Sequence, residues 1–235
     1  MPRRPLIAVA LLGALALTGC TSSPAPTSTP KPASTTQAPM SGDGTLSIGT
    51  LFPMTGGSAA SGAAQVAGTE LALRDILAEQ TIPTQAVQLV HRNSAGDLAA
   101  AYADLVARGV DLVLWDATTE LSADAESSVG SAALVALGDF ANGGTPLAAD
   151  ESFSARLRLA DPGLSATDGG AEAYDGVITA ALAAVIAGDD GGASLKAAWP
   201  RVVSGSAVCG TFGECVFALD AKQTIEYQGI TGRRS

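Results

Sequence analysis

Short apolar runs alternate with segments of helical periodicity over the first hundred residues of the body of this chain. The apolar runs have strand length and lie at residues 46–52, 87–90, 110–115 and 132–137. Strand, helix, strand in strict alternation is the pattern of a parallel sheet with crossover helices. Near-continuous apolar strands agree with this, because both faces of such a sheet are covered. We therefore expect an α/β fold.

The segments between the strands predict helices with one apolar face. The first is expected to bury these residues: Ala63, Val66, Leu73, Ile76 and Leu77. The second is expected to bury these: Leu98, Tyr102, Leu105 and Val106. A weaker helix is expected at 121–130. Farther along, helices are expected at 151–159, at 171–187 and from Ser194, the last interrupted by Pro200, with a strand-like run at 223–228.

Ligands of open parallel sheets bind outside the carboxyl ends of the strands. The loops that follow the predicted strands are therefore the candidates for a binding site. They are residues 53–61, 93–97, 116–120 and 138–144.

The N-terminus has the features of an export signal. Arg3 and Arg4 precede an apolar run of about twelve residues, which is short for a membrane span of about 20. The run ends in Leu17-Thr18-Gly19-Cys20, which resembles a bacterial lipobox. Residues 1–19 are thus predicted to be a lipoprotein signal peptide and Cys20 to be the lipidated residue.

Residues 20–44 predict an extended tether. Fourteen of the twenty residues from Thr21 to Met40 are Pro, Ser or Thr, a composition that buries no apolar area. The whole chain has a formal net charge of −10, which argues against nucleic acid as a partner, because phosphate binding needs clustered Lys and Arg. The expected location is extracytoplasmic, on the cell membrane, through the N-terminal lipid.

The start and end of the body resemble a known family. The run from Leu46 through Pro53-Met54-Thr55-Gly56 to Gly68-Thr69-Glu70, the segment Tyr174-Asp175-Gly176, and the cysteine-containing tail are similar to the solute-binding lipoproteins of branched-chain amino-acid ABC transporters. That resemblance implies a type I periplasmic-binding fold, an ABC permease as partner and an amino acid or similar small polar solute as ligand. It implies no cofactor and no catalysis.

Members of that family are longer and have two complete lobes around the ligand. The resemblance therefore implies a near-complete first lobe at 45–144 and a truncated second lobe at 145–235. The family's contacts from the third and fourth strand loops fall on Thr118 and Thr119 and on Asp139 and Phe140, with Ser58 in the first loop. Asp139 and Phe140 depart from the family pattern, and a carboxylate at 139 favours an amine or a neutral polar group.

The cysteines and the histidine have simpler interpretations. Cys209 and Cys215 enclose five residues, and in an exported protein this spacing predicts a structural disulfide. His91 is the only histidine and has no hydrolase motif around it, so a surface or loop position is expected rather than a catalytic one. With one histidine, the cysteine pair predicts no zinc site.

Three functions are compatible with these features. The first is a lipid-anchored solute-binding protein of an ABC-type importer. The second is a non-transport envelope lipoprotein whose degenerate binding lobe acts as an interaction or sensing module. The third, an envelope hydrolase, rests only on the presence of Ser, Asp and one His.

Overall fold

A four-stranded, wholly parallel sheet lies at the centre of the protein. The computed structural model describes residues 40–79, 86–116, 132–137 and 150–232. The sheet has the strand order β2-β1-β3-β4, with β1 paired to β2 and β3, and β3 paired to β4. Its strands are β1 (Thr45–Phe52), β2 (Ala86–Asn93), β3 (Leu112–Trp115) and β4 (Ala133–Ala136). The predicted α/β class with a parallel sheet is confirmed. The predicted strands lie within two residues of the observed ones, except that β2 ends three residues later than predicted.

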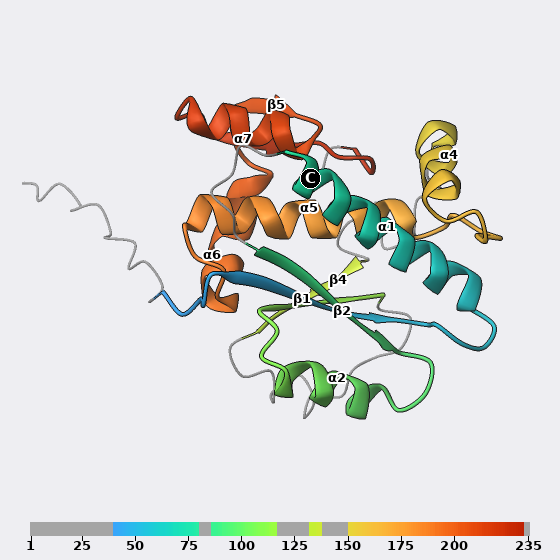
Figure 1. The fold of residues 1–235 in the computed structure, drawn as a ribbon. Helices are drawn as coiled ribbons and strands as arrows, with labels where there is room; N and C mark the ends of the chain where they lie inside the picture. Colours follow the sequence, from blue (N-terminus) through green and yellow to red (C-terminus); the bar gives the residue numbers. More distant parts are fainter. Residues whose placement is uncertain (1–39, 80–85, 117–131, 138–149, 233–235) are drawn as a thin grey trace, which may run out of the picture. The chain divides into compact units, whose positions relative to one another are not determined.

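Helices cover both faces of this sheet (Figure 1). They are α1 (Ala59–Ala78), α2 (Leu98–Ala107), α4 (Glu151–Ala160), α5 (Gly170–Ala187), α6 (Gly192–Val202) and α7 (Phe212–Asp220). In the view of Figure 1, α1 and α5 lie above the sheet and α2 lies below it. Residues at 121–130, where a further helix was expected, lie outside the described residues.

The side chains of β1 alternate between these two layers. Ile48 and Phe52 belong to the larger apolar cluster, on the side of α1 and α5, and Leu51 belongs to the cluster formed with α2. Gly49 also faces α2, because a Cβ on it would meet the Leu105 side chain at 3.0 Å. Alternation of apolar residues toward two covered faces is what a buried parallel strand requires.

The helices α1 and α5 pack against each other through very small residues. A Cβ on Gly68 of α1 would lie 2.1 Å from the carbonyl oxygen of Gly170, and a Cβ on Gly170 would lie 2.9 Å from the carbonyl oxygen of Ala64. The two backbones therefore touch, which only glycine permits at these positions. This contact places α5 beside α1 over the same face of the sheet.

The buried face of α1 differs from the prediction. Of the five residues expected to face the core, only Ile76 is buried; Ala63 and Leu77 are exposed, and Val66 and Leu73 are partly buried. The buried face consists mainly of small residues instead, among them Ala64, Ala67, Gly68 and Ala72. The apolar periodicity misled because close packing against α5 selects small side chains rather than large ones.

The C-terminal part of the chain continues the same core. One apolar cluster contains Ile48 and Leu114 of the sheet together with Leu182, Leu195 and Tyr227. The predicted boundary at 144 therefore does not divide the hydrophobic core. Among the described residues beyond it, the strands are β5 (Ala207–Cys209) and β6 (Ile225–Tyr227), which pair in parallel with each other.

The helix α6 contains a proline, and the helix α5 is long and apolar. Pro200 does not end its helix, since α6 continues to Val202; its fixed φ suits the helix, and only one hydrogen bond is lost in the last turn. The helix α5 is apolar and long enough to cross a membrane, but it is mostly buried inside the protein, as a core helix is.

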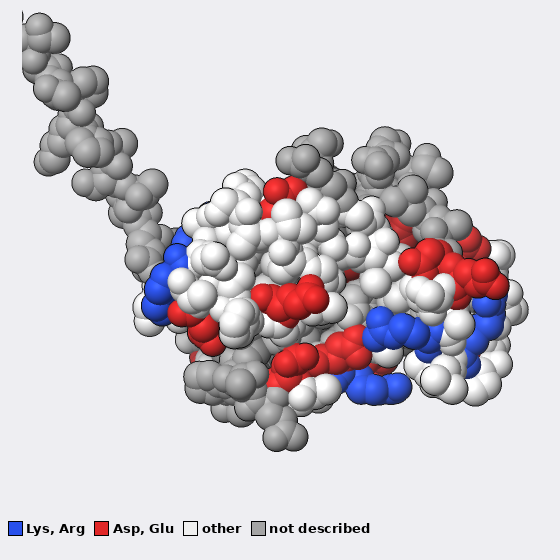
Figure 2. All heavy atoms as spheres, turned by 90° about the horizontal axis from the view of Figure 1, so that it is seen from above, with Lys and Arg blue, Asp and Glu red and all other residues white. Residues whose placement is uncertain are grey.

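In the view from above, large uncharged areas of the protein surface separate groups of acidic side chains (Figure 2).

Candidate functional site

The carboxyl edge of the sheet is organised by Asn93, the last residue of β2. Its Oδ1 accepts the backbone N–H of Met54 at 2.9 Å and that of Ala95 at 3.0 Å. Its Nδ2 donates to the Thr55 hydroxyl at 2.8 Å. One amide thus ties together the loops that follow β1 and β2. The predicted turn at 93–97 is present, and Asp97 caps α2 by accepting the N–H of Ala100 at 2.9 Å.

A small open hollow of about 270 Å³ lies at this edge, beside the start of α1. We call it the α1 hollow. Its lining residues are Met54, Ala59, Ala63, Val66 and Asp161. Met54 follows β1, three of the residues lie on α1, and Asp161 follows α4. Asp161 is the one charged residue among these five, and one oxygen of its carboxylate accepts the N–H of Gly163 at 2.9 Å.

The α1 hollow explains why Ala63 is exposed and why Val66, which also packs against the core, is only partly buried. They lie on the side of α1 that faces the hollow, and the opposite side packs against α5. A hollow of this size is near the lower end of small-molecule sites, which span roughly 300–1,000 Å³. It can hold a small solute with a short apolar part.

Ser58 stands at the amino-terminal end of α1, next to the hollow residue Ala59. It is exposed, and its side chain makes no capping hydrogen bond to the helix. The amino-terminal end of a helix carries unsatisfied N–H groups and a partial positive charge, which favour an anionic group. Of the predicted ligand-binding residues, Ser58 is the one within the described part of the chain.

The other predicted ligand residues cannot be placed against the hollow. Thr118, Thr119, Asp139 and Phe140 lie outside the described residues, as does the predicted lipidation site Cys20. The described residues that precede the two loops end at the same edge of the sheet, since Trp115 pairs with Leu51 on one side and with Ala136 on the other. The sequence did not identify Asp161, because it lies outside the loops that follow the predicted strands.

His91 lies in β2 and not on a loop. Its Nδ1 is 2.7 Å from the Thr50 hydroxyl, and its Nε2 is 3.1 Å from a carboxylate oxygen of Glu70 on α1. Hydroxyl, imidazole and carboxylate in this order resemble a hydrolytic triad. Thr50, however, is completely buried, so its hydroxyl cannot reach a substrate. The three residues are a connection between the sheet and α1.

Tyr174 and Asp175, from the segment that carries the family resemblance, are both structural. The Tyr174 hydroxyl donates to Asp75 at 2.6 Å, and its ring packs edge-on against Phe153 at 5.2 Å. Burial and the neighbouring Asp75 carboxylate raise the pKa of this tyrosine well above its usual range. Arg156 of α4 also pairs with Asp75, at 2.6 Å. This cluster fastens α4 to α1 and α5.

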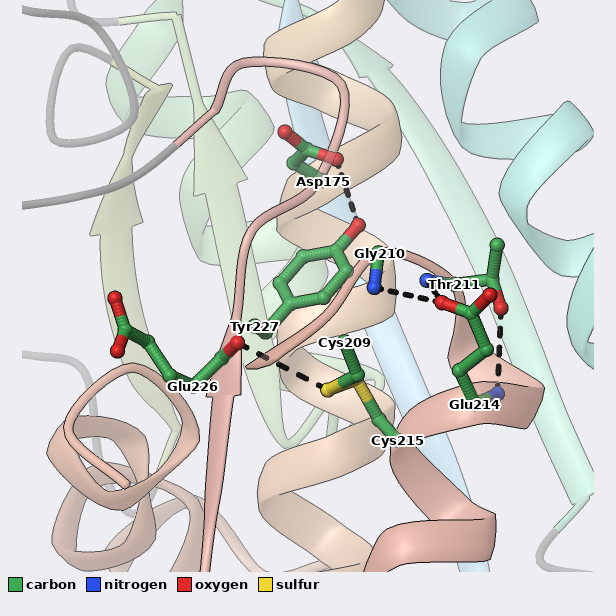
Figure 3. The surroundings of a disulfide bond; sticks show 8 residues. All are labelled: Asp175, Cys209, Gly210, Thr211, Glu214, Cys215, Glu226 and Tyr227. Atoms are coloured by element: carbon green, nitrogen blue, oxygen red, sulfur yellow. Dashed lines mark hydrogen bonds between the residues drawn. A yellow bond between two sulfur atoms is a disulfide. The ribbon is translucent and has the colours of Figure 1, made fainter. Parts of the chain in front are cut away.

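The predicted disulfide is confirmed: Cys209 of β5 is bonded to Cys215 of α7 (Figure 3). The same turn has a capping box, in which the Thr211 hydroxyl accepts the N–H of Glu214 and the Glu214 carboxylate accepts the N–H of Thr211. Both cysteines are buried. The pair therefore stabilises the C-terminal turn and is not exposed to redox partners.

No protein-family model matches the sequence. No curated protein matches it either.

Proposed function

We propose that this chain is a lipid-anchored solute-binding protein that captures an amino acid or a similar small polar solute for an ABC-type importer. The observation that carries the proposal is the α1 hollow, because it lies at the carboxyl edge of a parallel sheet, where such folds bind ligands. The export signal, the lipobox and the tether supply the anchoring part of the proposal. A type I periplasmic-binding fold is proposed with it.

The chemistry of the hollow suits a zwitterion. The amino-terminal end of α1 with the Ser58 hydroxyl attracts a carboxylate. The Asp161 carboxylate attracts an ammonium group, and Ala59, Ala63 and Val66 contact a short apolar side chain. These three features match the carboxylate, the ammonium group and the short apolar side chain of an α-amino acid.

Isothermal titration of the full-length protein in detergent, with each proteinogenic amino acid singly, tests the binding part. We expect heat with one or a few of them. Ser58→Ala is expected to weaken binding about tenfold, the equivalent of about 1.4 kcal/mol, since it removes a hydrogen bond to a charged group. Asp161→Asn is expected to weaken it further. A folded protein that releases no heat with any amino acid would contradict the proposal.

The anchoring part has a separate test. Mass spectrometry of the protein extracted from membranes is expected to show a chain that begins at Cys20 and carries lipid on its sulfur. A mature protein that begins elsewhere, or an unmodified Cys20, would remove the anchor without affecting the binding site.

One observation favours the second function, an envelope lipoprotein that acts as an interaction or sensing module. The described residues beyond 150 pack into the same core as the sheet, and their strands are only three residues long. A clamshell that closes on its ligand needs two separately packed lobes. Pull-down of an envelope protein together with absence of amino-acid binding would favour this function over solute capture.

A further inference from the structure

The last residues of the predicted tether, directly before β1, are held in a socket between α5 and α6. The Asp189 carboxylate, which follows α5, accepts the backbone N–H of Gly42 at 2.9 Å and that of Ser41 at 3.3 Å. Gly191 completes the socket, because a Cβ on it would lie 2.2 Å from the Ser41 hydroxyl oxygen. Residues 41–43 are called the tether segment below.

Gly42 of the tether segment covers a buried carboxylate. A Cβ on Gly42 would lie 1.5 Å from Oδ1 of Asp190, so the glycine backbone rests directly on that side chain. Asp190 is only 1% exposed, and its Oδ2 has no hydrogen-bond partner among the described residues. An ionised carboxylate oxygen in this position is costly, because neither water nor a donor solvates it.

Asp190 is one of three carboxylates that act on Asp111. Burial, and then repulsion by Asp190, Asp43 and Asp189, raise the pKa of Asp111 to about 6, although its carboxylate accepts the N–H of Ser47 at 2.9 Å. Asp43 belongs to the tether segment, Asp111 precedes β3, and Asp189 adjoins Asp190. Among the described residues, none of these four carboxylates is paired with a Lys, Arg or His side chain.

We propose that the tether segment is a pH-sensitive cover, docked over Asp190 while Asp111 holds a proton and released when Asp111 is ionised. Release gives water access to Asp190 and moves Asp43 away from the other charges. Its cost is small, since water replaces the two hydrogen bonds to Asp189. In weak acid, the proton on Asp111 lowers the repulsion within the group and the segment stays docked.

Release would change where the chain leaves the body. The tether segment lies at the amino-terminal end of β1, and the α1 hollow lies at the opposite edge of the sheet. Release frees three residues, about 10 Å of extended chain, before β1.

The mobility of a spin label beside the tether segment tests this proposal. Met40 is 71% exposed, so Met40→Cys gives a label site that does not disturb packing. Full-length protein with Met40→Cys and Cys20→Ser carries one free thiol, because Cys209 and Cys215 are bonded. We expect a severalfold slower motion of the label at about pH 5 than at about pH 8, with EDTA present throughout to exclude bound cations.

Matched variants identify the group responsible. Asp190→Asn removes the buried charge and is expected to give slow motion at both pH values. Asp189→Ala removes the acceptor for the segment and is expected to give fast motion at both. Asp168→Asn is the control: it removes an exposed carboxylate at the other end of α5, about 27 Å away, and should behave as the unsubstituted protein does.

Two results would overturn the proposal. The first is a label motion that is the same at both pH values in the unsubstituted protein. The second is a pH response that persists in Asp190→Asn. Circular dichroism of every sample at both pH values separates release of the segment from unfolding of the protein.

Discussion

The Asp175 carboxylate accepts the Tyr227 hydroxyl at 2.7 Å and so joins α5 to the last strand, 52 residues later in the chain. The same carboxylate accepts the N–H of Ile230 and both the N–H and the hydroxyl of Thr231. Asp175 is completely buried, yet both of its oxygens are hydrogen-bonded. It holds the C-terminal segment on the core.

This network predicts graded losses of stability. Tyr227→Phe removes one hydrogen bond and is expected to lower the free energy of unfolding by about 1–2 kcal/mol. Asp175→Asn is expected to cost about 3 kcal/mol or more, because its amide group faces the Thr231 N–H, which is also a donor. Urea denaturation measures both. Phe217→Ala, at an exposed site on α7, is the control; if it costs as much as Asp175→Asn, the network is not the cause.

The backbone contact between α1 and α5 predicts that the protein is less stable with alanine than with glycine at position 68 of α1. Gly68→Ala places a methyl group 2.1 Å from the Gly170 carbonyl oxygen, so we expect it to destabilise the protein although alanine has the higher helix propensity. Gly96→Ala, whose Cβ meets nothing within 4 Å, is the matched control and should change the melting temperature little. Equal melting temperatures for the two variants would show that the helices are not in backbone contact.

Asp111 predicts a fall in stability as the pH rises. Burial and its acidic neighbours raise its pKa from 3.8 to about 6 in the native protein. Between these values the native state holds a proton that the unfolded state has released, so the stabilising contribution is full below about pH 4 and is lost as the pH rises through about 6. Melting temperatures should show this fall in the native sequence and a smaller one in Asp111→Asn. An identical pH profile for the two proteins would contradict it.

The disulfide is expected to make a modest contribution to the free energy of unfolding. It closes a short loop, with a sequence separation of 6, so its loss should cost about 2 kcal/mol by the chain-entropy estimate. The double variant Cys209→Ser, Cys215→Ser should therefore remain folded and melt at a lower temperature. Reduction of the native protein should give the same shift, and a much larger loss in the variant alone would indicate that the serines disturb packing.

The central sheet could be predicted from the sequence because its signals are local. The strand that ends at Phe52, the turn that begins at Asn93 and the capping role of Asp97 each depend on residues close in the chain. The buried face of α1 could not be predicted in this way, since Gly68 is there for its contact with Gly170, about a hundred residues later. The pairing of β5 with β6 was missed because three-residue strands have no periodicity to detect.

In the candidate site too, only the residues identified by local sequence signals could be predicted. Ser58 was identified because it lies in the loop after a predicted strand. Asp161 was missed because its position opposite Met54 depends on how α4 packs on α1. The acidic neighbours of Asp190 come from three separate parts of the chain, and no sequence pattern joins them.

Filling the α1 hollow tests the central claim most directly. Ala63 lines the hollow, and Ala60, which is also exposed and lies in the first turn of the same helix, does not. We expect calorimetry with the amino acid that binds the native protein to give an unchanged Kd for Ala60→Trp and a Kd at least about tenfold higher for Ala63→Trp, since the indole fills the space of the solute. Native affinity in Ala63→Trp would contradict the account, because the solute would then bind elsewhere.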